Sequence, residues 1–169
     1  MARKGKEVID AAVLAEGLLQ YALQPAGPEL QPECSQHYLD ELLFLRLFTV
    51  DYVLGLKSST CPVFSNVRQH YNEEIDRFCD GSKEPHTING IIAARFTIYS
   101  EACNANTTAP KEYGGKKMVF WELGKAFSRI ASDAQPWVPS ALEVSVHANI
   151  FMSELKRLSE FLELYEVTD

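Results

Sequence analysis

The sequence predicts an all-α protein, a single-domain antiparallel bundle of five to six helices. Apolar residues recur at spacings of three and four, no useful stretch alternates apolar with polar residues, and Gly and Pro interrupt the pattern. The 169 residues are 46% hydrophobic and 23% charged, which is ordinary for one globular domain. We therefore expect one helical domain over residues 1–169, with residues 1–6 as a flexible tail.

The first two helices are expected at residues 4–24 and 35–54, joined by a Pro-rich segment. The inward face of the first helix is formed by Val8, Ala12, Ala15, Leu19 and Ala22. The second helix contains "LLFLRLFTVDYVL", in which ten of thirteen residues are apolar. It is expected to end at Gly55, since glycine suits the left-handed position after a helix.

The third helix is expected to open at Pro62, because the first N–H groups of a helix have no partner within it. Its inward face is formed by Phe64, Val67, Tyr71, Ile75 and Phe78. The fourth helix, at about residues 87–103, is apolar on nearly every side. That pattern predicts a second central helix beside the second one.

The fifth helix follows the loop "NANTTAPKEYGG" and faces inward through Val119, Phe120, Leu123, Phe127 and Ile130. The sixth begins with a capping box, in which Ser140 and Glu143 satisfy each other's backbone N–H groups. It is expected to run for about 28 residues, or roughly 40 Å. We expect this length to exceed the cover of its neighbours and leave part of its apolar seam for a second chain.

A homodimer is therefore predicted through the last part of the sixth helix. Its interface residues are expected to be Leu155, Leu158, Leu162 and Tyr165, which share one side of the helix. A twofold pairing is the simplest closed arrangement. The competing expectation is that the first helix covers the whole seam.

Three charged residues in the apolar helices are candidates for ligand binding: Arg46, Asp51 and Arg95. Arg46 and Asp51 are five residues apart, so they point about 140° from each other on a helix and cannot pair. One interpretation is that each arginine bridges to an acid on a neighbouring helix. The candidate acids are Asp51, Glu74, Glu101 and Glu143. The other interpretation is a cleft in which both guanidinium groups hold one anionic ligand.

Three histidines have an acid four positions away on the same helix. These pairs are His37 with Glu41, His70 with Glu74, and Glu143 with His147. Residues at this spacing face the same way and could present imidazole and carboxylate to a metal. The chain has 23 acids, so about two of its histidines are expected by chance to have an acid three or four positions away. It also lacks the Glu-x-x-His spacing of di-metal bundle enzymes. No cofactor is predicted.

Charge and composition narrow the classes of function. The net charge is −7 and the basic residues are scattered, so we expect no nucleic-acid partner. Charged residues interrupt the most apolar segment and the N-terminal region, which predicts neither a membrane span nor a secretory signal. A cytoplasmic location is therefore expected.

No catalytic motif is found in the sequence. The leading interpretation is an interaction, adaptor or regulatory protein that self-associates through the sixth helix or docks on another protein. The alternative is a small metal- or anion-binding enzyme or sensor built inside the bundle.

Overall fold

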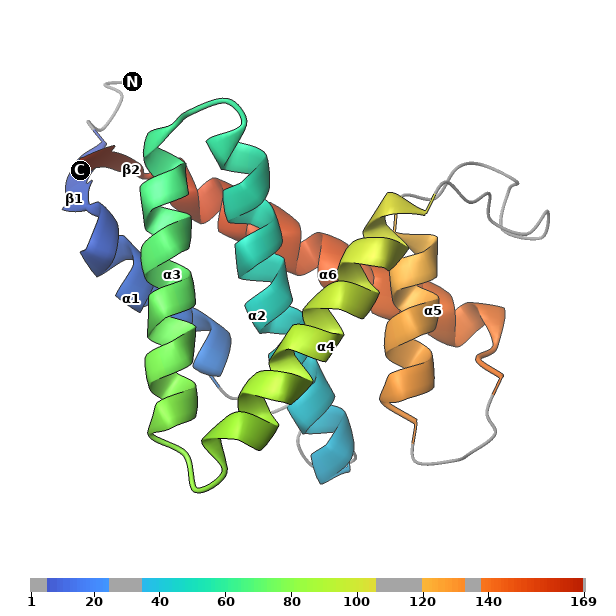
Figure 1. The fold of residues 1–169 in the computed structure, drawn as a ribbon. Coiled ribbons are helices and arrows are strands. Elements are labelled where there is room, and N and C mark those ends of the chain that lie inside the picture. Colours follow the sequence, from blue (N-terminus) through green and yellow to red (C-terminus); the bar gives the residue numbers. More distant parts are fainter. Residues whose placement is uncertain (1–5, 25–34, 106–119, 133–137, 169) are drawn as a thin grey trace.

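Six helices and two short strands make up the described part of this computed structural model, residues 6–24, 35–105, 120–132 and 138–168. In chain order they are β1 (Glu7–Asp10), α1 (Ala11–Leu23), α2 (Gln36–Ser58), α3 (Val63–Asp80), α4 (Pro85–Asn104), α5 (Trp121–Ile130), α6 (Ala141–Leu162) and β2 (Tyr165–Thr168) (Figure 1). The predicted helical fold is confirmed. The antiparallel bundle arrangement stays a prediction. Within the predicted tail, only Lys6 lies among the described residues.

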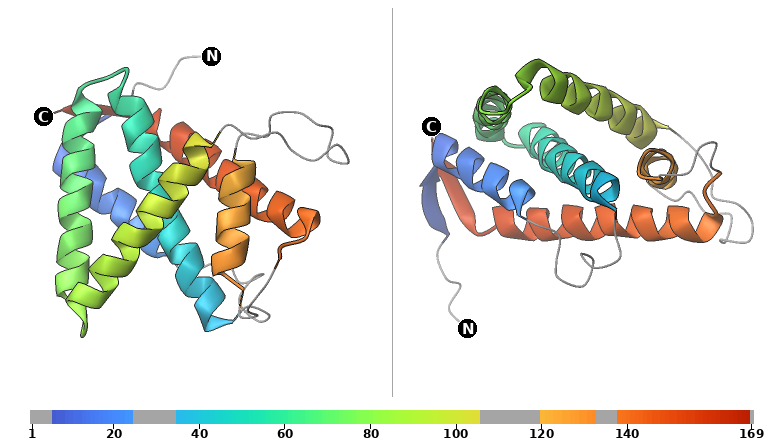
Figure 2. Two further views of the ribbon diagram at one scale, coloured as in Figure 1. Left: turned by 45° about the vertical axis from the view of Figure 1, so that its right-hand side comes forward. Right: turned by 90° about the horizontal axis from the view of Figure 1, so that it is seen from below.

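The helix α2 occupies the centre of the fold and contacts every other helix. Figure 2 shows it between α1 and α6 on one side and α3 and α4 on the other, with α5 next to α4 and α6. This position requires apolar residues in many directions around the helix axis, which is what the run from Leu42 to Leu54 provides.

The helix α4 lies on the outside of the fold, so the prediction of a second central helix was wrong. Its only buried residues are Ile92 and Tyr99, while Ala93, Ala94 and Thr97 are exposed. Small apolar residues tolerate exposure, and an apolar helix therefore need not be surrounded by other helices.

The prediction that α2 ends at Gly55 was also wrong, because the helix continues to Ser58. Gly55 instead makes room for an arginine of α3. A Cβ atom at Gly55 would lie 3.2 Å from Nη1 of Arg68. The glycine thus lets the Arg68 guanidinium lie directly against the α2 backbone.

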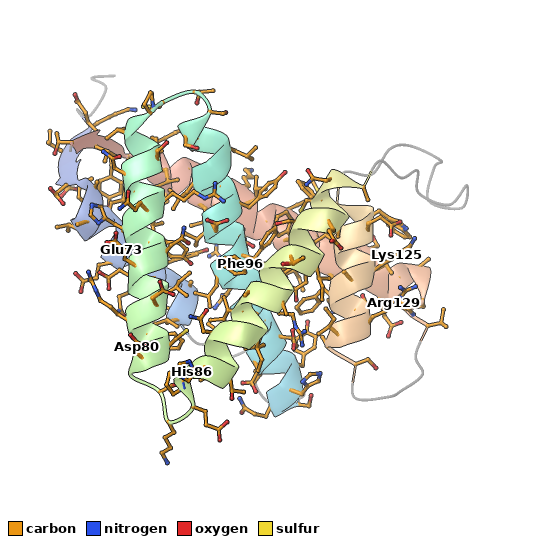
Figure 3. The ribbon with its side chains drawn as sticks, viewed as in Figure 1. Glu73, Asp80, His86, Phe96, Lys125 and Arg129 are labelled. Carbon is orange, nitrogen blue, oxygen red and sulfur yellow. The ribbon has the colours of Figure 1, made fainter. Side chains whose placement is uncertain are left out.

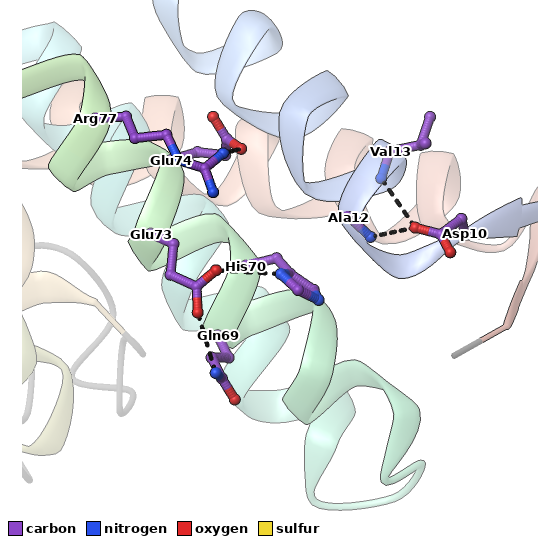
Figure 4. Close-up of polar contacts among 8 residues, drawn as sticks. All are labelled: Asp10, Ala12, Val13, Gln69, His70, Glu73, Glu74 and Arg77. Atoms are coloured by element: carbon purple, nitrogen blue, oxygen red, sulfur yellow. Dashed lines mark hydrogen bonds and ion pairs between the residues drawn. The ribbon is translucent and has the colours of Figure 1, made fainter. Parts of the chain in front are cut away.

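The two ends of the described chain pair as a parallel two-stranded sheet, with Glu7 opposite Tyr165 and Asp10 opposite Thr168. Two predicted boundaries were therefore wrong. The first helix begins at Ala11, where the Asp10 carboxylate accepts from the N–H groups of Ala12 and Val13 (Figure 4). The sixth helix has 22 residues and ends at Leu162. Each strand has four residues, too few for a local pattern to reveal.

The helices α5 and α6 approach each other closely at Gly124. A Cβ atom there would lie 2.4 Å from the carbonyl oxygen of Val144 and 3.1 Å from the backbone nitrogen of Ala148. Both atoms belong to the backbone of α6, so relief requires the two helices to move apart.

Substituting Gly124→Ala is therefore expected to lower the free energy of unfolding by about 1–3 kcal/mol, the usual cost of overpacking. Chemical denaturation would measure the change. Gly90→Ala in α4 is the matched control, because its Cβ would meet no atom within 4 Å. It is expected to be neutral or to stabilise by up to ~1 kcal/mol. Equal effects of the two substitutions would contradict the close packing at Gly124.

Candidate functional site

The four residues of the predicted dimer interface pack inside the chain's own fold. Leu158 and Leu162 are each 2% exposed and belong to a core cluster shared with residues of α1, α2 and α3. Leu155 and Tyr165 are partly buried against the same cluster. Neighbouring elements thus cover the seam that was expected to need a second chain. The homodimer itself stays a prediction, but this seam no longer supports it.

Arg95 of α4 forms a two-bonded ion pair with Glu41 of α2. Its Nε and Nη2 donate to the two carboxylate oxygens at 2.7 and 2.5 Å. Glu41 is only 2% exposed. Burial and, second, the nearby charge of Glu41 raise the pKa of the Tyr99 phenol. The predicted pairing of an arginine with an acid on a neighbouring helix is thus observed here, although the acid is not one of the four candidates.

Arg46 joins α2 to α1 and α6. Its Nη1 donates to the carbonyl oxygen of Gln24 at 2.6 Å, and its Nη2 lies 3.9 Å from a carboxylate oxygen of Glu154. Glu154 also accepts a hydrogen bond from the Tyr21 hydroxyl. Burial, together with this bond, raises the pKa of Tyr21 to about 12. Arg46 and Arg95 therefore bond to different residues and join different helices. A ligand held by both arginines stays a prediction.

Asp51 pairs with Arg68 of α3, a residue that the sequence analysis did not select. Nε and Nη2 of Arg68 donate to the two Asp51 oxygens at 2.6 and 2.7 Å. The pair lines an open cleft whose other lining residues come from α4 and its C-terminal end, among them Phe96, Ser100 and Glu101. Arg68 lies on the side of α3 next to the buried Val67 and Tyr71, which the helical spacing predicted, but no local signal connected it to Asp51.

The acids four residues from His37 and His70 bond elsewhere. Nε2 of His37 lies 2.6 Å from the carbonyl oxygen of Ile130, at the end of α5. Nδ1 of His70 lies 3.3 Å from a carboxylate oxygen of Glu73, three residues on, while Glu74 pairs with Arg77 (Figure 4). The i,i+3 spacing of His70 and Glu73 is the sequence signal for this contact.

His147 of α6 bonds to Ser128 of α5, with Nδ1 2.6 Å from the serine Oγ. Its predicted partner Glu143 accepts from the N–H and hydroxyl of Ser140, which confirms the capping box. Burial lowers the pKa of His147, which favours the neutral imidazole. Ser128 is 1% exposed, so this pair joins two helices and its hydroxyl does not face solvent.

These contacts do not bring the predicted metal ligands together into one cluster. Across the described ranges 6–24, 35–105, 120–132 and 138–168, no three His, Cys, Asp or Glu side chains are grouped so that they could hold a metal ion. The histidine and the acid of each predicted pair share one side of their helix, as the four-residue spacing requires. The three acids nevertheless bond to other residues, namely Arg95, Arg77 and Ser140.

The first half of α6 carries an apolar surface on one side of the helix, outside its buried seam. Leu142, Val146 and Met152 are 66%, 48% and 47% exposed. On a helix, the residues that share this side between positions 142 and 153 are Leu142, Ser145, Val146, Asn149, Met152 and Ser153. None of them is charged. We call these six residues the outer face of α6, and it is the candidate functional site.

The longer heptad seam dominates the apolar pattern of this helix, so the outer face was not predicted from the sequence. Leu142, Val146 and Met152 do not fall on that seam, and this departure was the signal that could have revealed them. The outer face ends where charged residues follow on the same side of the helix, namely Lys156, Arg157 and Glu160.

Searches of family models, curated proteins and solved structures find no match for this chain. Among the described helices, none is both long enough and apolar enough to cross a bilayer.

Proposed function

We propose that this chain is an interaction protein that self-associates through the outer face of α6. The observation that supports this proposal is the set of three exposed, large apolar side chains on a face without charged residues. Interface cores are depleted of charged residues and enriched in methionine, whereas ordinary protein surfaces carry about a quarter to a third charged residues.

A second copy of the chain fits this face because the face is complementary to itself. Leu142 and Met152 lie near its two ends, and Val146 lies between them. When two α6 helices cross antiparallel about a twofold axis, Leu142 of one copy approaches Met152 of the other. Such a pairing is closed and repeats each contact twice.

The apolar surface sets the scale of the expected affinity. Fully burying a large apolar side chain contributes roughly 1.5–3 kcal/mol, and these residues are about half to two-thirds exposed. A stable interface buries about 800 Å² per partner, so surrounding residues must contribute. We therefore expect a dimer whose population depends on protein concentration.

Light scattering from micromolar to millimolar protein would test the proposal. The wild-type mass is expected to approach twice the 19.0 kDa of one chain. Val146→Glu is expected to give the monomer mass with an unchanged circular dichroism spectrum, because Val146 is 48% exposed and outside the core.

Leu56→Glu is the matched control, since Leu56 is a 51% exposed leucine on α2. It is expected to leave the mass of the dimer unchanged. A wild-type monomer at every concentration would refute self-association. Equal loss of mass in both variants would refute the assignment to α6.

A further inference from the structure

A small pocket lies between α5 and the start of α6. Its volume is about 280 Å³ and it is lined by Trp121, Lys125, Arg129, Val138, Pro139, Ala141 and Val144. None of these residues belongs to the outer face of α6. Ligand binding in the pocket therefore does not require self-association.

The inner part of the pocket is apolar. Trp121 and Val144 are each 2% exposed and pack together with Ala141. Val138, 86% exposed, adds an aliphatic side chain that is open to solvent. Ligand sites are mostly apolar with a few polar groups, and their volumes begin at about 300 Å³. The pocket is thus suited to the apolar body of a small molecule.

Two cationic residues of α5 line the same pocket. Lys125 and Arg129 are four residues apart, and Figure 3 shows them one turn apart along α5. Lys125 donates to Glu122 at 2.6 Å. Arg129 is exposed, and no described residue forms a hydrogen bond or ion pair with it. Its guanidinium is therefore available to a ligand.

The positive charge of Lys125 and Arg129 in the pocket is opposite in sign to the net charge of the whole chain, which is −7. A guanidinium matches the two oxygens of a carboxylate, and such charge-assisted bonds are about twice as strong as neutral ones. The N-terminus of α6 is already capped by Ser140 and Glu143, so the positive charge of the pocket comes from Lys125 and Arg129 of α5. Together these groups favour a ligand with one negative charge.

We infer that this pocket binds a small amphipathic carboxylate. The apolar body of the ligand lies against Trp121, Ala141 and Val144, and its carboxylate pairs with Arg129. Lys125 adds a second positive charge one turn away, partly offset by Glu122. The ligand is a free small molecule with an aromatic or aliphatic body of a few carbons.

Phenylacetate is a suitable probe, followed by two-dimensional NMR of the full chain. Binding is expected to shift the indole signal of Trp121 and the backbone amides of Ala141 and Val144. Phenylacetamide has the same shape without the charge, so it is expected to bind about tenfold more weakly. Absence of these shifts at millimolar phenylacetate would overturn the inference.

The double variant Lys125→Gln, Arg129→Gln is expected to weaken phenylacetate binding at least about tenfold. Lys156→Gln is the matched control, since Lys156 is a 77% exposed cation of α6 outside the pocket. It is expected to bind like the wild type. Equal affinity of the double variant and the wild type would refute the role of the two cations.

Ala141→Leu tests the cavity separately from the charge, because it fills the pocket and keeps both cations. It is expected to abolish the shifts at Val144, and unchanged binding would place the ligand elsewhere. Val146→Glu is expected to keep phenylacetate binding. This variant therefore separates a failure of the pocket from a failure of self-association.

Discussion

Replacing Leu158 and Leu162 together with glutamate is expected to unfold the protein instead of dissociating a dimer. Both leucines are 2% exposed within a core shared by α1, α2, α3 and α6. A buried carboxylate without a partner costs several kcal/mol, and a whole domain has only about 5–15 kcal/mol of stability. Far-UV circular dichroism is expected to show loss of most helix at 25 °C.

Lys156→Glu is the control for this variant, because it places the same side chain on a 77% exposed position of α6 outside the outer face and changes the net charge by the same amount. It is expected to retain the helical spectrum. Light scattering on the double variant gives the second measurement. A folded monomer would contradict the burial of the two leucines and return the interface to the seam.

Arg95→Met is expected to lower the free energy of unfolding by about 3–5 kcal/mol. The substitution leaves the Glu41 carboxylate, 2% exposed, without the guanidinium that bonds both of its oxygens. Urea denaturation would measure the loss. The double variant Glu41→Leu, Arg95→Met is expected to recover most of the stability, because replacing both partners of a buried pair by apolar residues is often nearly neutral.

Arg77→Met is the matched control on α3. Its side chain is 67% exposed and pairs with Glu74 three residues earlier, so the substitution is expected to cost at most about 1 kcal/mol. A similar small loss in Arg95→Met would show that solvent or another group satisfies Glu41.

The helices could be predicted from the sequence because their signals are local. The capping box of Ser140 and Glu143 gave the start of α6, and Pro62 directly precedes the first residue of α3. Arg46 and Asp51 indeed bond to other residues, as their five-residue spacing required. These predictions depend only on geometry within one helix.

The partner of each charged residue could not be predicted in this way. Glu41 was assigned to His37 by spacing, but Arg95 lies 54 positions away in sequence and holds it. Likewise, the parallel pairing of β1 with β2 joins the two ends of the described chain. Contacts of this kind depend on how the helices are placed in space, which no local spacing encodes.

The helix α6 shows most directly what local sequence signals determine and what tertiary contacts decide. By itself, the sequence determined that a helix begins at the capping box of Ser140 and Glu143 and carries an apolar seam that includes Leu158. Only the tertiary structure decided which side is buried. Helical spacing sets the direction of each side chain around the axis, but the elements packed opposite that direction decide whether it meets protein or water.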